Sequence, residues 1–147
     1  MCSSDLGSAV VMIEPRRHGG TEKILNDSDV TDLIIRSAIE VHRTLGPGLL
    51  ESAYEECLCY ELILNGTPLQ QQKSLPLIYK GLRLECGYRM DIVVAGRVVV
   101  ELKCVEKILP IHEAQLLTYL KLSGLRTGLI LNFHTHVLKD GIKRLVL

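Results

Sequence analysis

Two neighbouring runs of apolar, largely β-branched residues constrain the fold of this chain most strongly. They cover residues 88–94 and 97–105 and are separated by Ala95-Gly96. This combination predicts a β-hairpin. The second run is apolar on both faces until Glu101, a pattern typical of a strand that lies inside a sheet.

Three charged residues, Asp91, Glu101 and Lys103, interrupt this apolar hairpin. An unpaired ion costs several kcal/mol to bury, so we expect each charge to be compensated. One interpretation is a metal ion held by the two carboxylates. The competing interpretation is a solvated strand face on which Asp91 forms a cross-strand salt bridge.

The register of the hairpin decides whether Asp91 lies on the same face as Glu101 and Lys103. A three-residue loop centred on Gly96 places Asp91 directly opposite Glu101, whereas a two-residue loop pairs Asp91 with Val100. We predict the first register, or a bulge that gives the same result. Two adjacent carboxylates raise each other's pKa unless a cation lies between them, and oxygen ligands suit Mg²⁺ or Mn²⁺. Lys103, on the same face as Glu101, would then orient a metal-bound water or help deprotonate it.

The rest of the chain predicts an α/β (α+β) fold, in which helices flank a mixed sheet. Ser28 or Asp29 is expected to cap the first helix, which Gly46-Pro47-Gly48 ends. Pro76 suggests an edge strand. The C-terminal residues 137–147 fit either helix or strand. The expected helices cover residues 26–45, 50–64 and 110–123, and the further strands cover residues 75–79, 82–86 and 127–133.

Length and composition indicate one globular domain, residues 27–147, after a poorly ordered leader, residues 1–26. Residues 2–6 resemble a translated sequencing adapter, so we expect the natural start to lie further in, at Met12. The net charge is zero, so any phosphate binding must be local. No run is long and apolar enough to predict a membrane span.

The five cysteines, Cys2, Cys57, Cys59, Cys86 and Cys104, are an odd number without a metal-binding spacing. We therefore expect a cytoplasmic protein whose cysteines are small buried apolar residues.

The order of motifs resembles the PD-(D/E)XK nuclease superfamily. Asp91 is followed by Glu101-x-Lys103. Upstream lies Gly48-x-x-Glu51-x-x-Tyr54, and downstream lies Gln115-x-x-x-Tyr119. RecB-like members carry motifs of these kinds in this order, and the match is closest to the GxxExxY family of small bacterial proteins.

The resemblance implies a restriction-endonuclease-like core and a nuclease dependent on Mg²⁺ or Mn²⁺. Its expected substrate is nucleic acid, with DNA favoured. Asp91, Glu101 and Glu51 would bind the metal, and Lys103 would serve the attacking water. The remaining motif residues, Gln115, Tyr119 and Tyr54, would contact substrate phosphate or support the site.

A second hypothesis is a non-catalytic nucleic-acid or protein interaction module that retains the nuclease fold. The neutral charge and small size leave little surface for gripping a substrate, so a protein partner or a homodimer is part of either hypothesis. His112 lies near the predicted site, with a local contact as its alternative role. His134-x-His136 has no matching ligands nearby in the sequence.

Overall fold

The computed structural model describes residues 10–11 and 25–147. Most of the expected leader, including Cys2 and Met12, lies outside the described residues. The helices are α2 (Asp27–Leu45), α3 (Glu51–Leu64), α4 (Pro110–Ser123) and the 3₁₀ helix η1 (Leu138–Gly141). The strands are β1 (Val10–Val11), β2 (Leu69–Ser74), β3 (Leu77–Tyr79), β4 (Leu82–Leu84), β5 (Arg89–Val94), β6 (Val98–Lys103), β7 (Thr127–Asn132) and β8 (Ile142–Val146).

Six of the strands form one mixed sheet in the order β1-β2-β5-β6-β7-β8. Strands β6 and β7 are parallel, because helix α4 connects them, and the other neighbouring strands are antiparallel. Strand β6 is central, as its apolar pattern predicts, and Val98, Val99 and Val100 are fully buried. The predicted class, a mixed sheet flanked by helices, is confirmed.

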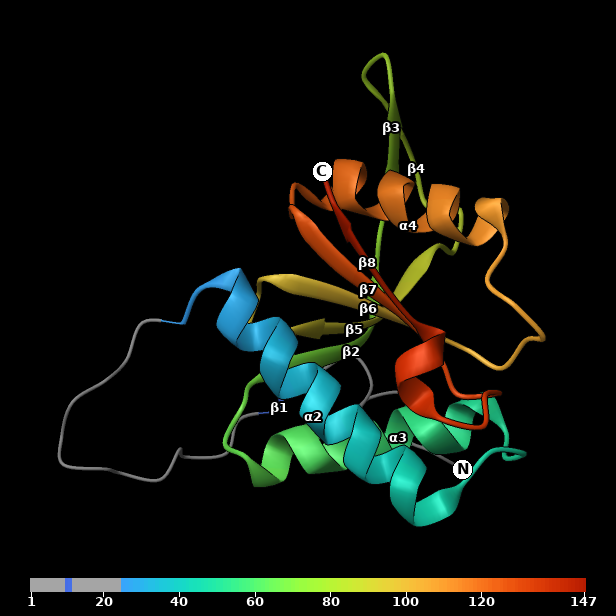
Figure 1. The fold of residues 1–147 in the computed structure, drawn as a ribbon. Coiled ribbons are helices and arrows are strands. Elements are labelled where there is room, and N and C mark those ends of the chain that lie inside the picture. The colour runs from blue at the N-terminus through green and yellow to red at the C-terminus, as the bar shows by residue number, and fades with distance from the viewer. Residues whose placement is uncertain (1–9, 12–24) are drawn as a thin grey trace, which may run out of the picture.

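Helices cover both faces of the sheet (Figure 1). Helices α2 and α3 pack on one face, where Ile34 and Leu58 meet Ile92 and Val100. Helix α4 packs on the other face, where Leu116 meets Val99 and Ile130. The approach of α4 is close: a Cβ at Gly128 would lie 2.8 Å from Leu116 Cδ1. Two apolar layers therefore fix strands β5 and β6 from both sides.

The β5–β6 hairpin has the predicted register. Val94 pairs with Val98 and Ile92 pairs with Val100, so the loop has three residues centred on Gly96. Within it, the Arg97 N–H donates to the Val94 carbonyl at 2.9 Å, and Gly96 has a φ of +64°. Continuing this register places Asp91 opposite Glu101, at the end of the hairpin away from the turn.

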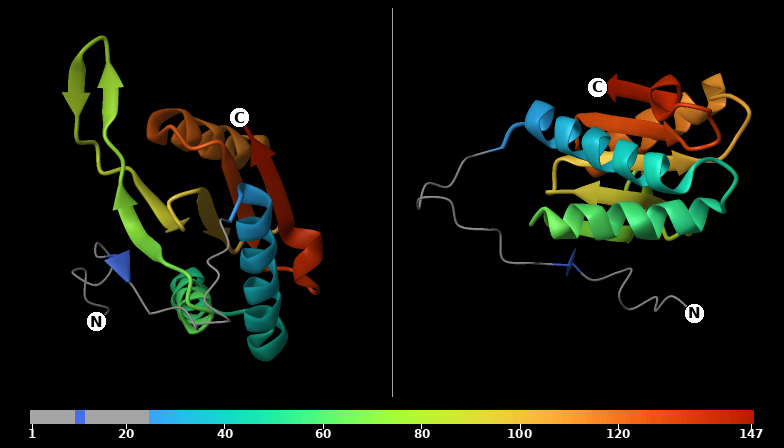
Figure 2. Two further views of the ribbon diagram at one scale, coloured as in Figure 1. Left: turned by 90° about the vertical axis from the view of Figure 1, so that its left-hand side faces the viewer. Right: turned by 60° about the horizontal axis from the view of Figure 1, so that its bottom comes forward.

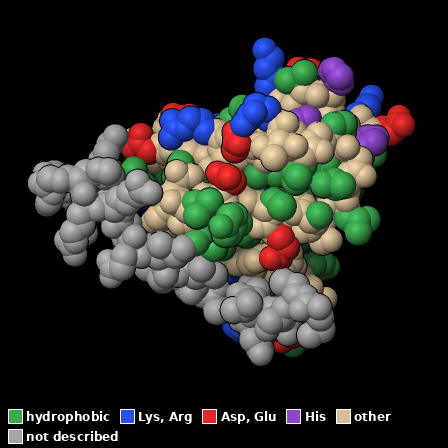
Figure 3. All heavy atoms as spheres, turned by 90° about the horizontal axis from the view of Figure 1, so that it is seen from below, with side chains coloured by type: hydrophobic (Ala, Val, Ile, Leu, Met, Phe, Trp, Pro, Cys, Tyr) green, Lys and Arg blue, Asp and Glu red, His purple; other side chains and the backbone are tan. Residues whose placement is uncertain are grey.

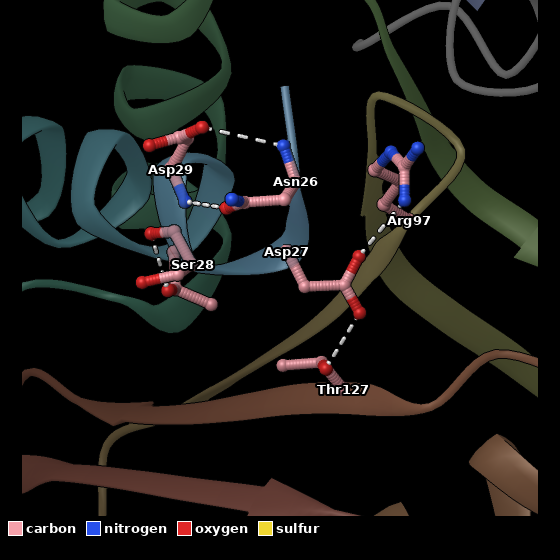
Figure 4. A network of polar contacts seen from close by, with 7 residues as sticks. Asn26, Asp27, Ser28, Asp29, Arg97 and Thr127 are labelled. Atoms are coloured by element: carbon pink, nitrogen blue, oxygen red, sulfur yellow. Dashed lines mark hydrogen bonds and ion pairs between the residues drawn. The ribbon is translucent and has the colours of Figure 1, made fainter. Parts of the chain in front are cut away.

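The N-terminus of α2 is tied to that turn (Figure 4). Asn26 is the cap: its side chain accepts from the Asp29 N–H at 2.8 Å, and Asp29 accepts from the Asn26 N–H. The prediction of Ser28 or Asp29 as the cap was wrong, because Asp29 is the reciprocal partner three residues into the helix. Asp27 accepts from Arg97 at 3.2 Å and from Thr127 at 2.8 Å.

Two parts of the chain differ from the expected strands. Strand β2 was not predicted, and it pairs with β5 along the edge of the predicted hairpin. Within residues 25–147, strands β3 and β4 pair only with each other and form a ribbon that projects beyond the sheet (Figure 2). Pro76 lies just before this ribbon, in which both strands are edges. The ambiguous C-terminal segment forms η1 and then β8.

The cysteines are less buried than expected. Cys59 is buried, Cys57 and Cys104 are partly buried, and Cys86 is exposed. The prediction of buried cysteines was therefore wrong for Cys86, which follows the exposed ribbon. Among the described residues, no helix combines the length and the apolar character that a membrane crossing requires.

Candidate functional site

The site begins where β5 and β6 separate. The Glu101 carboxylate accepts a hydrogen bond from the Asp91 N–H at 2.9 Å, and the Asp91 carboxylate accepts one from the Leu102 N–H at 2.9 Å. Each acid therefore satisfies a backbone donor of the opposite strand just beyond the paired residues Ile92 and Val100. This crossed arrangement fixes both carboxylates at the same end of the sheet.

Burial makes these carboxylates difficult to ionise. It raises the pKa of Glu101 to about 8, and the nearby charge of Asp91 adds to this effect, while the Asp91 N–H and Lys103 oppose it. The pKa of Asp91 is also raised by burial, against the hydrogen bonds from Leu102 and Gln72 and the charge of Lys103. Two acids with raised pKa values at one site form an arrangement that a cation would stabilise.

Lys103 is the last residue of β6 and lies two residues after Glu101, on the same face of the strand. It is half-buried, and its charge lowers the pKa values of Asp91, Glu101 and Glu51. Among the described residues it forms no ion pair within 4.0 Å. Its ammonium group is therefore close to the acids without being bound tightly to one of them.

Helix α3 brings two more carboxylates to the site. Glu51 is its first residue, and the pKa of Glu51 is raised by partial burial and by the charge of Asp91, and lowered by Lys103. Glu55 follows one turn later and is buried. The pKa of Glu55 is raised mainly by burial, with smaller contributions from Asp91 and Glu56. Glu51 thus lies within electrostatic range of the strand residues.

A glutamine pair on β2 links this helix to the strands, and our sequence analysis missed it. Gln71 donates to Glu55 at 2.8 Å and to Glu56 at 2.6 Å. Gln72 donates to both oxygens of Glu55 at 3.0 Å and to Asp91 Oδ1 at 3.3 Å. Gln72 has a φ of +52°, in the left-handed region. The spacing of Glu55 one turn after Glu51 was the one available sequence signal.

Gln115 and Tyr119 lie on α4, on the opposite side of the sheet from α3. Gln115 Nε2 donates to the Tyr119 hydroxyl at 3.0 Å. The pKa of Tyr119 is raised by burial and then by the charges of Glu101 and Asp91, and lowered by the Gln115 hydrogen bond. The two residues predicted to act together are therefore in contact, and Tyr119 lies near both strand acids.

Tyr54 does not contact the strand acids. It is fully buried, stacks on Phe133 with ring centroids 4.5 Å apart, and donates its hydroxyl proton to the Gly46 carbonyl. The same hydroxyl accepts from the Leu49 N–H at 3.1 Å. Tyr54 therefore holds the loop from which Glu51 and α3 begin.

The three histidines that the sequence singled out do not join the site. His112 Nδ1 accepts from the Leu109 N–H at 2.9 Å at the N-terminus of α4, which is the local contact considered as its alternative role. His134 and His136 lie in the loop between β7 and η1. In the described part of the chain, no three His, Cys, Asp or Glu residues are grouped closely enough to hold a metal ion.

The donor chemistry nevertheless fits a hard divalent cation. Asp91 and Glu101 each use one oxygen for a backbone N–H, and their other oxygens, Oδ1 and Oε1, are not used by the backbone. The charge of Lys103 acts on three carboxylates with raised pKa values, those of Asp91, Glu101 and Glu51. Carboxylate oxygens are the ligands that Mg²⁺ and Mn²⁺ prefer.

The family comparison agrees with this arrangement. A family model described as the PD-(D/E)XK nuclease superfamily matches residues 28–145, which include the whole site, the strands from β2 to β7 and all but the last residue of β8. The searches of curated proteins and of solved structures gave no match. With a family match over most of its length and a mixed sheet flanked by helices, this chain belongs to the PD-(D/E)XK nuclease superfamily.

Proposed function

We propose that this protein is a nuclease that depends on a divalent metal and hydrolyses phosphodiester bonds in nucleic acid, with DNA as the expected substrate. We further assign it to the GxxExxY family within the RecB-like branch, on the motifs at Glu51, Asp91, Glu101 and Gln115. The superfamily match and the order of these motifs support this assignment.

The observation that carries the proposal is the convergence of Asp91, Glu101 and Lys103 at one end of the β5–β6 hairpin. Asp91 and Glu101 would hold the metal, with Glu51 as a further ligand from α3. The metal, Mg²⁺ or Mn²⁺, would supply charge neutralisation at the phosphate and activation of water.

The chain's own residues supply the remaining requirements of hydrolysis. The Lys103 ammonium group orients the attacking water and balances the charge that develops on the phosphate oxygens. Gln72 and the Leu102 N–H hold Asp91 in place through hydrogen bonds. Gln115 and Tyr119 are placed on α4 to contact the substrate phosphate or to support the acids.

The second candidate is an interaction module without turnover. It is favoured by the hydrogen bonds between the two strand acids and the backbone, which give these carboxylates a structural role in the protein without metal. The net charge of zero also supports it.

A cleavage assay separates the two candidates. Wild type, Asp91→Asn and Glu101→Gln protein are incubated with labelled DNA and RNA in Mg²⁺, in Mn²⁺ and in EDTA. A nuclease cleaves only with metal, and both isosteric variants lose cleavage because each removes one negative ligand. Equal cleavage by wild type and both variants would reject the assignment of the site, and no cleavage by any of them would favour the interaction module.

A further inference from the structure

The ribbon formed by β3 and β4 is a projecting feature that the proposed active site does not use. Among the strands that the structure describes, these two pair only with each other, through Leu77 with Leu84 and Tyr79 with Leu82. Figure 2 shows the ribbon projecting from the body of the protein. Ile78, Tyr79, Leu82 and Leu84 are all exposed. A two-stranded ribbon is only marginally stable in water, so a surface of this kind indicates a binding partner.

The ribbon rises from the end of the sheet that carries the site. It is inserted between β2 and β5, and at its base Ser74 pairs with Arg89 and the Leu75 N–H donates to the Tyr88 carbonyl at 2.9 Å. Asp91 follows Arg89 by two residues. A long molecule that reaches the acids is therefore also close to the ribbon.

The charge of the ribbon identifies the class of partner. Residues 73–89 contain four basic side chains and one acidic one, a local net charge of +3 in a chain whose net charge is zero. The basic residues are Lys73, Lys80, Arg83 and Arg89. Lys80 is at the tip, where it lies 5.4 Å from the centre of the Tyr79 ring and has a φ of +46°. Arg83 forms an ion pair with Glu85 at 2.8 Å.

These observations favour a polyanion over a second ribbon. Packing two identical ribbons against each other would bring like charges together at a cost. A two-stranded ribbon fits the major groove of a duplex, where lysine and arginine meet phosphates and apolar side chains contact base edges and methyl groups.

Resting on the proposed function, we propose that the β3–β4 ribbon binds double-stranded nucleic acid and holds the duplex against the site. Lys80 contacts the phosphate backbone, and the exposed apolar residues of the ribbon enter the groove. The substrate class is therefore a duplex.

A protein partner is the alternative that the test must detect. The groove between α2 and α3 has a volume of about 440 Å³ and is lined by apolar residues, including Leu45 and Tyr60, together with Glu40, Glu56 and Glu61. Figure 3 shows hydrophobic side chains gathered among acidic ones on the underside of the molecule. The protein partner to be tested is therefore a second copy whose basic, apolar ribbon would occupy this acidic, apolar groove.

The test compares Lys80→Glu with Lys139→Glu, a variant with the same charge change on the exposed part of η1. Binding to a fluorescent duplex and to one of its single strands is measured by anisotropy in EDTA, so that the nucleic acid stays intact, at several salt concentrations. Circular dichroism verifies that each variant is folded, and sedimentation gives its oligomeric state.

We expect the wild-type protein to prefer the duplex. Lys80→Glu should weaken duplex binding by roughly tenfold and lower the salt slope by about one unit, because one phosphate contact is lost. Lys139→Glu should bind as the wild type does. Equal duplex affinity in both variants, no preference for duplex, or a dimer that Lys80→Glu dissociates without changing duplex affinity would each overturn the proposal.

The duplex-binding test of the ribbon and the cleavage test of the nuclease activity can fail independently. If the wild-type protein cleaves phosphodiester bonds but Lys80→Glu leaves duplex affinity unchanged, the ribbon proposal fails and the proposed function stands. If Lys80 is required for duplex binding but no cleavage occurs with metal, the proposed function fails and the ribbon proposal stands.

Discussion

The Asp91 backbone N–H donates a 2.9 Å hydrogen bond to the Glu101 carboxylate on the neighbouring strand. The reverse connection runs from the Leu102 N–H to the Asp91 carboxylate. Where β5 and β6 separate, the two carboxylates therefore accept hydrogen bonds from backbone N–H groups of the opposite strand, in place of backbone carbonyls, and they do so at a buried position. This relationship explains both their fixed geometry and their raised pKa values.

Replacing Glu101 with glutamine should change how stability depends on pH. The pKa of Glu101 is about 8 in the folded protein, against an ordinary value of 4.5. Between these values the folded state binds more protons than the unfolded state, so in the protein without metal this residue's contribution to stability falls as pH rises. Urea unfolding in EDTA should show Glu101→Gln to be more stable than wild type at pH 9, by roughly 2 kcal/mol or more.

At pH 5 the difference in unfolding free energy between Glu101→Gln and wild type should nearly disappear. The Glu101 carboxyl group of the wild type and the glutamine amide of the variant are then both neutral in the folded state. The amide oxygen of the glutamine can still accept from the Asp91 N–H. A constant difference across the whole pH range would contradict the assignment of the pKa of about 8 to this residue.

Gln72→Glu should destabilise the protein more than Gln70→Glu on the same strand. Gln72 donates to Glu55 and Asp91, so a glutamate there removes both donations and adds a third carboxylate. We expect a loss of about 1–3 kcal/mol at pH 8 and a smaller loss at pH 4, because burial raises the pKa values of Glu55 and Asp91 and so favours their neutral forms as the pH falls. Chemical denaturation at the two pH values measures this difference, and equal effects of the two variants would contradict the network.

Tyr54→Phe should loosen the loop before α3 without disturbing the core. The stacking on Phe133 is retained, but the Gly46 carbonyl and the Leu49 N–H each lose a partner. We expect a loss of about 1 kcal/mol in unfolding free energy and faster hydrogen exchange at the Leu49 amide. Unchanged exchange at Leu49 would show that Tyr54 does not hold this loop.

Lys103→Ala should separate chemistry from metal binding. Lys103 lies near the acids but is not a metal ligand in our proposal, so Mn²⁺ affinity should stay within a few-fold of the wild-type value. Cleavage should fall by at least roughly a hundredfold. Lys107→Ala, which removes an exposed lysine four residues later, is the control. Loss of activity in both variants to the same extent would argue against a specific role for Lys103.

The apolar hairpin made the central part of the fold predictable. The β-branched runs on both sides of Ala95-Gly96 predicted β5 and β6, and the three-residue loop predicted the register that the structure has, in which Val94 pairs with Val98 and Ile92 with Val100. This prediction succeeded because a shift of one residue would turn every apolar side chain of one strand to the wrong face.

The flanking elements were harder to predict for physical reasons. Strand β2 has the sequence Leu69-Gln-Gln-Gln-Lys-Ser74, whose residues have little β propensity, and its pairing with β5 stabilises it. The roles of Gln72 and Glu55 depend on this pairing, so the sequence alone gave no reason to connect them with Asp91. The separate β3–β4 ribbon likewise depends on where β2 ends.

Calorimetric titration of Mn²⁺ tests most directly whether Asp91 and Glu101 hold a divalent metal. The titration is made at pH 8 with wild type, Asp91→Asn, Glu101→Gln and Glu106→Gln protein. Glu106 is exposed and lies outside the site, so its variant controls for the loss of one negative charge. We expect saturable binding to wild type and Glu106→Gln, and loss of that binding in Asp91→Asn and in Glu101→Gln. Wild-type affinity in both of these site variants would contradict a metal held by the two strand acids.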